Sequence, residues 1–243
     1  MSVFRNTVFL AVIAGLFAGI VMAGLQGMFT VPLILAAEAY EQTGAPAPDH
    51  DHGQEVAASD HHHGEDAWMP ADGAERTVYT VLVNIVTAIG FALVLVAASE
   101  AAGGIAGWRQ GLLWGLSGFA VFTLAPGLGL PPELPGMPAA DLLARQAWWI
   151  ATVCATAAGL ALIVFGRRAL LAVAGVALIV APHALGAPQP ASHETAVPAA
   201  LHHDFVVAVT LTNLVFWLVL GAAVGVARAR FAEAMDAPQS HLA

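Results

Sequence analysis

Six apolar runs long enough, or nearly long enough, to cross a lipid bilayer constrain the fold more than any other feature of this sequence. A hydrocarbon core about 30 Å thick takes roughly 20 residues of helix. Five runs meet that length, at residues 7–37, 77–99, 109–126, 147–165 and 205–227. A sixth run, ALLAVAGVALIVAPHALG after Arg168, is shorter and ends near Pro182. We predict an all-α polytopic membrane protein with about six transmembrane helices, built as one integral membrane domain over residues 1–243 and surrounded by lipid.

The composition supports this prediction and excludes several classes of protein. Hydrophobic residues make up 58% of the chain and charged residues only 10%, and the formal net charge is −9. A soluble domain carries more charge, and a nucleic-acid-binding protein carries a basic surface. The single cysteine, Cys154, lies within an apolar run, so this chain alone can build neither a disulfide framework nor a thiolate metal site. Any metal site must use nitrogen and oxygen ligands.

The arginines predict the orientation, because cytoplasmic loops retain positive charge. The chain has no lysine. Six spans with both termini in the cytoplasm place six arginines inside and two outside: Arg5, Arg109, Arg167, Arg168, Arg228 and Arg230 inside, Arg76 and Arg145 outside. This arrangement makes residues 229–243 a cytoplasmic tail and residues 38–76, 127–146 and 183–204 external, which in a bacterial inner membrane means periplasmic.

The first apolar run is the one that could be taken for a cleaved signal peptide. Its apolar stretch is about twice the usual length of a signal-peptide core, so we predict an uncleaved helix. Ala11, Gly15, Gly19 and Ala23 follow one another at helical spacing, which permits close helix contact. We expect this face to pack within the monomer, and a dimer face is the alternative.

An external loop at residues 42–75 contains DHDHGQEVAASDHHHGED at 49–66. Imidazole nitrogens and carboxylate oxygens suit divalent cobalt, nickel, zinc or copper. The histidines concerned are His50, His52, His61, His62 and His63. The composition predicts disorder, and a disordered segment cannot impose a coordination geometry, so the expected role is metal capture with low selectivity. The alternative is a solvated polar loop without a role.

Further candidate ligands stand where helices end on the same predicted face. Glu38 and Glu41 close the first span, three residues apart, and His183 follows Pro182. His202 and His203 open the last span. If Glu38, Glu41 and His183 converge, they form an oxygen and nitrogen site at the mouth of the bundle, because ionisable groups at membrane depth usually face a protein interior or a water cavity. The alternative is that each residue caps a helix at the interface.

The external segment 127–146 is rich in proline and glycine, and such backbone needs burial in protein or contact with water. We predict a structured cap over the outer mouth, with Glu133 as a candidate ligand and Arg145 as a candidate partner of Glu38 or Glu41. A rigid connector is the alternative.

Glu100 ends the second span near the cytoplasmic side. We favour a solvated acid at the helix end over a carboxylate on an exit path for the ion.

Six polar residues lie deeper in the spans. For them interhelical hydrogen bonds are favoured over an ion path. They are Gln26, Asn84, Thr87, Thr210, Thr212 and Asn213.

Three stretches together resemble the CbtA family of predicted cobalt transporter subunits: PLILAAEAYE at 32–41, GLGLPPELPGMPAADLLARQAWW at 127–149, and APHALGAPQP at 181–190. The resemblance runs over nearly the whole chain. It implies cobalt uptake linked to cobalamin synthesis, beside a small single-span, histidine-bearing partner of the CbtB kind. The motif positions it carries over are Glu38, Glu41, Glu133, Arg145 and His183, and the tract at 50–63 is similar to the variable metal-binding loop of such proteins.

The sequence lacks a G-x-x-x-x-G-K-[ST] phosphate loop, so no nucleotide partner is expected and this chain cannot hydrolyse ATP. We expect a permease subunit for divalent cobalt, with nickel or zinc as the other candidate metals and no bound cofactor. An accessory metal-binding membrane protein without its own path, or an efflux component, remains the alternative. An enzyme is not expected, since neither a nucleophile motif nor a dinucleotide fingerprint is present.

Overall fold

The structure, a computed structural model, describes residues 2–44 and 73–236, and within them every regular element is helical. The chain runs α1 (Ser2–Leu25), η1 (Gln26–Thr30), α2 (Val31–Gly44), α3 (Ala74–Ala101), α4 (Trp108–Phe119), η2 (Ala120–Leu124), α5 (Ala125–Gly129), α6 (Leu142–Phe165), α7 (Ala169–Leu185) and α8 (Ala199–Asp236). The elements η1 and η2 are single π-helical turns that join their neighbours without a break. The all-α prediction is therefore confirmed.

Five helical stretches are long and apolar enough to span a membrane: Arg5–Tyr40, Ala74–Ala101, Trp108–Gly129, Leu142–Phe165 and Ala199–Phe231. They coincide with the five long apolar runs. The shorter run forms α7, whose 17 residues give a helix about 25 Å long. This length is a little less than the hydrocarbon thickness, so α7 is a shorter apolar helix than the five spans. It packs beside α6 as the second helix of a hairpin.

The helices extend beyond several of the predicted loop boundaries. The cap predicted at 127–146 is non-helical only from Leu130 to Asp141, because α5 continues to Gly129 and α6 begins at Leu142. Asp141 starts α6 by accepting a hydrogen bond from the backbone N–H of Ala144 at 2.9 Å. Likewise α8 continues to Asp236, into the predicted tail 229–243, through alanine, arginine and glutamate, which favour helix.

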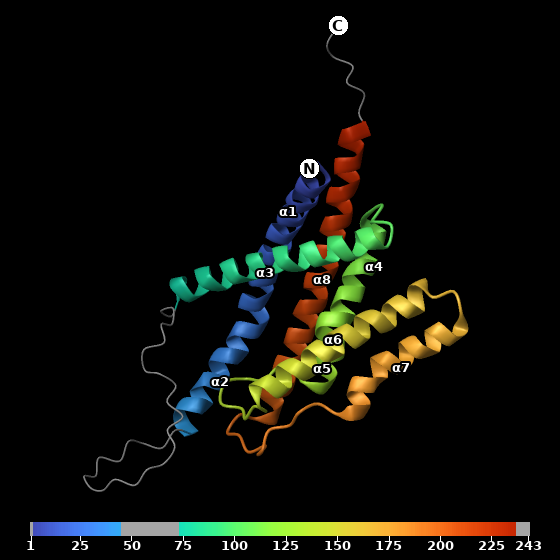
Figure 1. The fold of residues 1–243 in the computed structure, drawn as a ribbon. Helices are drawn as coiled ribbons and strands as arrows, with labels where there is room; N and C mark the ends of the chain where they lie inside the picture. Colours follow the sequence, from blue (N-terminus) through green and yellow to red (C-terminus); the bar gives the residue numbers. More distant parts are fainter. Residues whose placement is uncertain (1, 45–72, 237–243) are drawn as a thin grey trace, which may run out of the picture.

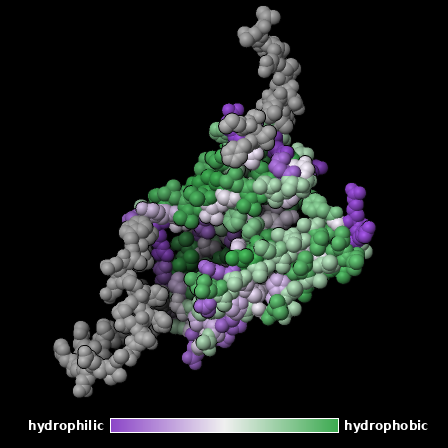
Figure 2. Space-filling view, in the orientation of Figure 1, coloured by the Kyte–Doolittle hydropathy of each residue, from purple (hydrophilic) through white to green (hydrophobic). Residues whose placement is uncertain are grey.

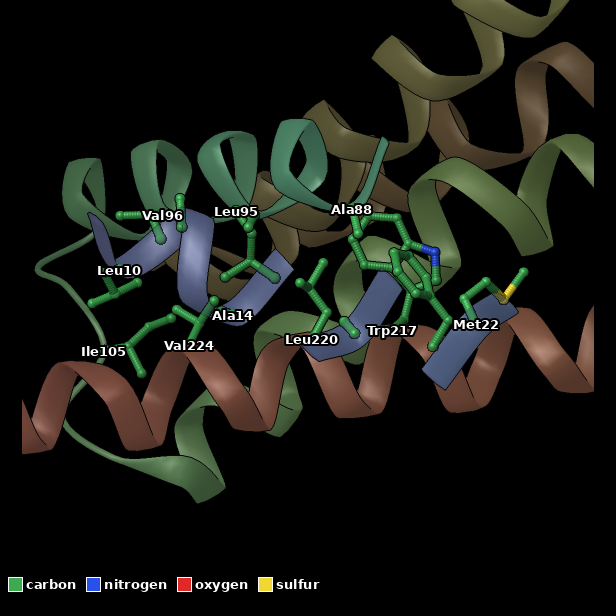
Figure 3. Close-up of a cluster of buried hydrophobic side chains, with 14 of the residues drawn as sticks. Leu10, Ala14, Met22, Ala88, Leu95, Val96, Ile105, Trp217, Leu220 and Val224 are labelled. Carbon is green, nitrogen blue, oxygen red and sulfur yellow. The ribbon is translucent and has the colours of Figure 1, made fainter. Parts of the chain in front are cut away.

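Helix α8 lies at the centre of the arrangement, between α1 and α4, while α3 crosses α1 and the α6–α7 hairpin lies on the far side of α4 and α5 (Figure 1). The main core forms where α1, α3 and α8 meet. Figure 3 shows Leu10, Ala14 and Met22 of α1 facing Trp217, Leu220 and Val224 of α8. Trp217 also stacks on Phe122 of η2, with ring centroids 5.6 Å apart.

Glycines allow the helices to approach at their backbones. A Cβ built on Gly15 or Gly19 would lie 2.5 Å and 2.6 Å from the Cα atoms of Ile89 and Ile85 on α3. The expectation that this face packs within the monomer is thus confirmed. The outer surface is mainly hydrophobic, and hydrophilic residues gather towards the ends of the helices, as expected for a chain surrounded by lipid (Figure 2).

Candidate functional site

One end of the bundle collects the irregular segments and most of the candidate ligands, and we call it the pocket end. A second apolar cluster holds it together, with Ala37 of α2, Leu134, Val197 and Phe205 of α8 buried against one another. This cluster joins α2, the segment 130–141, the segment 186–198 and the first turns of α8. All four histidines of the described chain, His183, His193, His202 and His203, lie at this end, between the last turn of α7 and the first turns of α8.

A pocket of about 140 Å³ opens between segments 130–141 and 186–198. Its polar lining includes Glu133, His193, His202 and Gln189, and Met137 contributes a thioether. The prolines of both segments supply rigid walls, since each fixes its own φ and has no N–H to donate. Thr195 ties the two segments by donating to the carbonyl of Gly136 at 3.1 Å. The pocket thus combines carboxylate, imidazole and thioether groups within a constrained backbone.

His202 is the best-oriented imidazole of this pocket. Its Nε2 lies 3.1 Å from the carbonyl oxygen of Pro132. Because a carbonyl only accepts, Nε2 must carry the proton, which leaves Nδ1 as the lone-pair nitrogen of the neutral ring. A carbonyl holding one ring nitrogen is the usual way in which a metal-binding histidine is oriented. The adjacent His203 is exposed and is not part of the pocket lining.

Both described candidate carboxylates of this end are held by arginines. Glu133 Oε2 lies 3.0 Å from Arg145 Nη2, and Glu38 Oε1 accepts a hydrogen bond from Arg76 Nη2 at 2.9 Å. The prediction that Arg145 pairs with Glu38 or Glu41 is wrong for Glu38. The reason is that α6 begins directly after the segment carrying Glu133, which brings Arg145 to that carboxylate, whereas the first turn of α3 brings Arg76 to α2.

His183 lies apart from these carboxylates. Its ring meets that of Trp148 edge to face, with centroids 5.7 Å apart, and Trp148 Nε1 donates to the carbonyl of Pro182 at 3.3 Å. Helix α7 ends at Leu185 and is followed by Gly186, whose φ of +85° suits glycine. Since Glu38 contacts α3 while His183 contacts α6, the described contacts do not bring the two together. In the part of the chain whose side chains the structure describes, no three His, Cys, Asp or Glu residues are grouped so as to hold a metal ion.

Several predicted ligands fall outside what the structure describes. His50, His52, His61, His62 and His63 lie outside the described residues, and Glu41 is placed only by its backbone in α2. Five of the six deeper polar residues divide into two groups. Asn84 Nδ2 donates to Gln26 Oε1 across α3 and η1 at 2.6 Å, so the expected interhelical bond is confirmed there. In contrast, Thr210, Thr212 and Asn213 donate to carbonyls of their own helix.

Glu100, at the opposite end, is an exposed acid at the end of α3, as predicted, and it also pairs with Arg228 of α8. Two residues of the pocket end were not found by sequence reasoning. His193 stands in an irregular segment without periodicity, and its only signal was its place between His183 and His202. Arg76 was counted as an external charge, but its pairing with Glu38 depends on the tertiary fold.

A family model described as "Probable cobalt transporter subunit (CbtA)" matches residues 4–229. The chain belongs to the CbtA family. No curated protein and no solved structure matches it. Membership confirms the resemblance carried by the proline-rich and helix-end motifs, and it makes this multi-pass membrane protein a probable cobalt transporter subunit. Membership in a family of transporter subunits implies a non-enzymatic role and a transported metal ion.

Proposed function

We propose that this subunit takes up divalent cobalt across a bacterial inner membrane, in support of cobalamin synthesis, and that cobalt enters at the pocket end from the periplasm. The observation that carries the proposal is the pocket lined by Glu133, His193 and His202 at the end where every described histidine lies. Residues 45–72 connect α2 to α3 at this end and contain five more histidines. Their role in the proposal is to raise the local concentration of metal.

Transport would follow an order set by ligand strength. The external loop, with its five histidines and many acids, captures cobalt without fixed geometry. The pocket then selects, with His202 Nδ1 as the oriented donor and with Glu133 and His193 as further candidate ligands in its lining. Glu38, Glu41 and His183 are candidate ligands outside that lining. Since the described part of the chain has no group of three ligands, a small histidine-bearing CbtB-like subunit would complete the coordination. An inward-negative membrane potential supplies about 2.3 kcal/mol per charge per 100 mV for a cation moving inwards.

The test is influx of radioactive cobalt into the native host at scarce metal. The chromosomal copy is replaced by the wild-type gene, by a deletion, by a variant lacking residues 49–66, or by His202→Ala. His203→Ala is the matched control, since it removes the neighbouring imidazole without touching the pocket. We expect the deletion to abolish high-affinity influx and His202→Ala to raise the KM for cobalt roughly tenfold or more. The loop deletion should reduce influx only when cobalt is scarce.

A metal-binding accessory protein is the second candidate, and one observation favours it. The middle portions of the described spans hold no acidic, basic or histidine side chain. Protein purified with its partner and reconstituted into liposomes separates the two functions. Cobalt flux driven by an imposed potential supports a permease subunit, whereas binding without flux supports the accessory role.

A further inference from the structure

The middle portions of the spans present a chemical problem for any cation that crosses them. The first span has no ionisable residue between Arg5 and Glu38, and α3 has none between Tyr79 and Glu100. An ion that has lost its water in this region meets only neutral ligands, because a charged side chain at this depth would be costly. The carbonyl oxygens of amide side chains are among the neutral ligands that these stretches contain.

Gln26 and Asn84 are two such amides, and they meet across the spans. Asn84 Nδ2 donates to Gln26 Oε1 at 2.6 Å, and both side chains are half-buried. Asn213, another amide in the middle of a described span, donates to the Val209 carbonyl of its own helix at 2.9 Å. Gln26 also begins the π-helical turn η1, and π-turns within α-helices occur frequently at functional sites. The Gln26–Asn84 pair therefore joins two elements where the first span departs from regular α-helical geometry.

The pair lies at the point where the first span and α3 begin to separate. On one side of it, Gly15 and Gly19 bring α1 against the backbone of α3, and this contact leaves no space for a side chain. On the other side, a Cβ built on Gly27 would meet no atom within 4 Å, so α3 does not pack against that face of η1. The first span then continues as α2, which packs on α8, and the ion pair between Glu38 and Arg76 connects it to α3.

The two spans thus form a wedge that is closed on the α1 side and open towards the pocket end. In Figure 2 the surface is hollowed between α3 and the helices below it in the view, which agrees with this wedge. The amide pair occupies the apex.

We propose that Gln26 and Asn84 form a gate through which the transported divalent cation passes, with their two side-chain carbonyl oxygens as its ligands. This inference rests on the proposed function, since it concerns the path of the same ion. In the described conformation the amides bond to each other and close the apex. When a cation arrives from the pocket end, the bond between them opens and both carbonyls turn to the ion. Neutral oxygens hold an ion weakly enough to release it, which conduction requires.

The test measures cobalt influx in the native host, where the partner subunit is present, with the chromosomal copy replaced by Gln26→Leu, Asn84→Leu or Thr87→Val. Thr87 is exposed on the same helix as Asn84, so it controls for the loss of a polar group from α3. Influx is normalised to folded protein, measured by size-exclusion chromatography of a fluorescent fusion. We expect each leucine variant to lower the maximal influx at least roughly tenfold, and Thr87→Val to keep it.

Asn84→Asp distinguishes a ligand from a residue that only holds the helices together. A carboxylate at this depth binds a divalent ion more tightly than an amide does, so KM and maximal rate should both fall. A purely structural role predicts that Asn84→Asp behaves as Asn84→Leu, and this result would overturn the inference, as would wild-type influx through the leucine variants. If the wild-type protein itself carries no cobalt, the proposed function fails and the inference fails with it.

Discussion

Gly221→Ala tests the packing of α4 on α8, which holds the centre of the protein. A Cβ on Gly221 would lie 2.9 Å from both the Cα and the N of Gly115 and closer still to the carbonyl oxygen of Gly111. All three atoms belong to the backbone of α4, so no side-chain rotation can relieve the contact. Small residues at such crossings allow helices to approach closely in a membrane.

The cost follows from the separation that the new methyl group enforces. To regain an ordinary contact of 3.4 Å, the two helices must move apart by at least about 0.5 Å at this crossing. A gap of that size forfeits about a quarter of the dispersion energy of each facing atom pair. Phe216, Trp217, Leu220 and Val224 are all buried on α8 beside Gly221, so many pairs are affected. Overpacking of this kind costs about 1–3 kcal/mol.

The assay is thermal unfolding of the detergent-solubilised protein, followed by size-exclusion chromatography of a fluorescent fusion. For a chain of this length each kcal/mol lowers Tm by about 2–4 °C. Gly27→Ala is the matched control, because a Cβ there meets nothing within 4 Å and the better helix propensity of alanine should leave Tm unchanged or slightly raised. If Gly221→Ala unfolds at the same temperature as Gly27→Ala, the close approach of α4 and α8 is refuted.

Three further substitutions probe the site and the packing around it. Glu133→Gln should raise the KM for cobalt influx several-fold yet lower the free energy of unfolding by less than about 1 kcal/mol, because its ion pair with Arg145 is partly exposed. An unchanged KM would argue against Glu133 as a ligand. Thr156→Val should raise Tm, since the buried Oγ1 of Thr156 has no hydrogen-bond partner among the described residues, and a lower Tm would show that the hydroxyl has one in solution. Trp148→Phe removes the hydrogen bond to the Pro182 carbonyl and should destabilise the protein by about 1 kcal/mol, seen as a lower Tm, while Tm equal to wild type would contradict that bond.

The membrane-spanning helices could be predicted from the sequence because their signal is local. Each long apolar run became a long helix, and Gly15 and Gly19 were assigned a packing role from their spacing alone. Helix ends were predicted less well, since caps decide them. Asp141 starts α6 before the apolar run at 147–165 begins. The preceding run was predicted to end at residue 126, but α5 continues to Gly129.

The candidate site could be predicted only as a set of residue types at one end of the bundle. Which carboxylate meets which arginine depends on how far apart the helices carry them, and this distance is not encoded in any local pattern. Glu38 therefore meets Arg76, which is distant in sequence, whereas Arg145 meets the nearby Glu133. His193 shares a pocket with His202 only because the segment before α8 folds back along residues 130–141.

The two ion pairs also explain the two exceptions to the arginine distribution. Arg76 and Arg145 are the arginines predicted on the periplasmic side, and each has a structural role there, joining α2 to α3 and the segment 130–141 to α6. Their charge, however, offsets that of Glu38 and Glu133, so neither carboxylate attracts a cation strongly while its arginine is in place. In the proposed function, the attraction is therefore assigned to the acids of residues 49–66. A divalent ion delivered from there carries twice the charge of the guanidinium that it would have to replace.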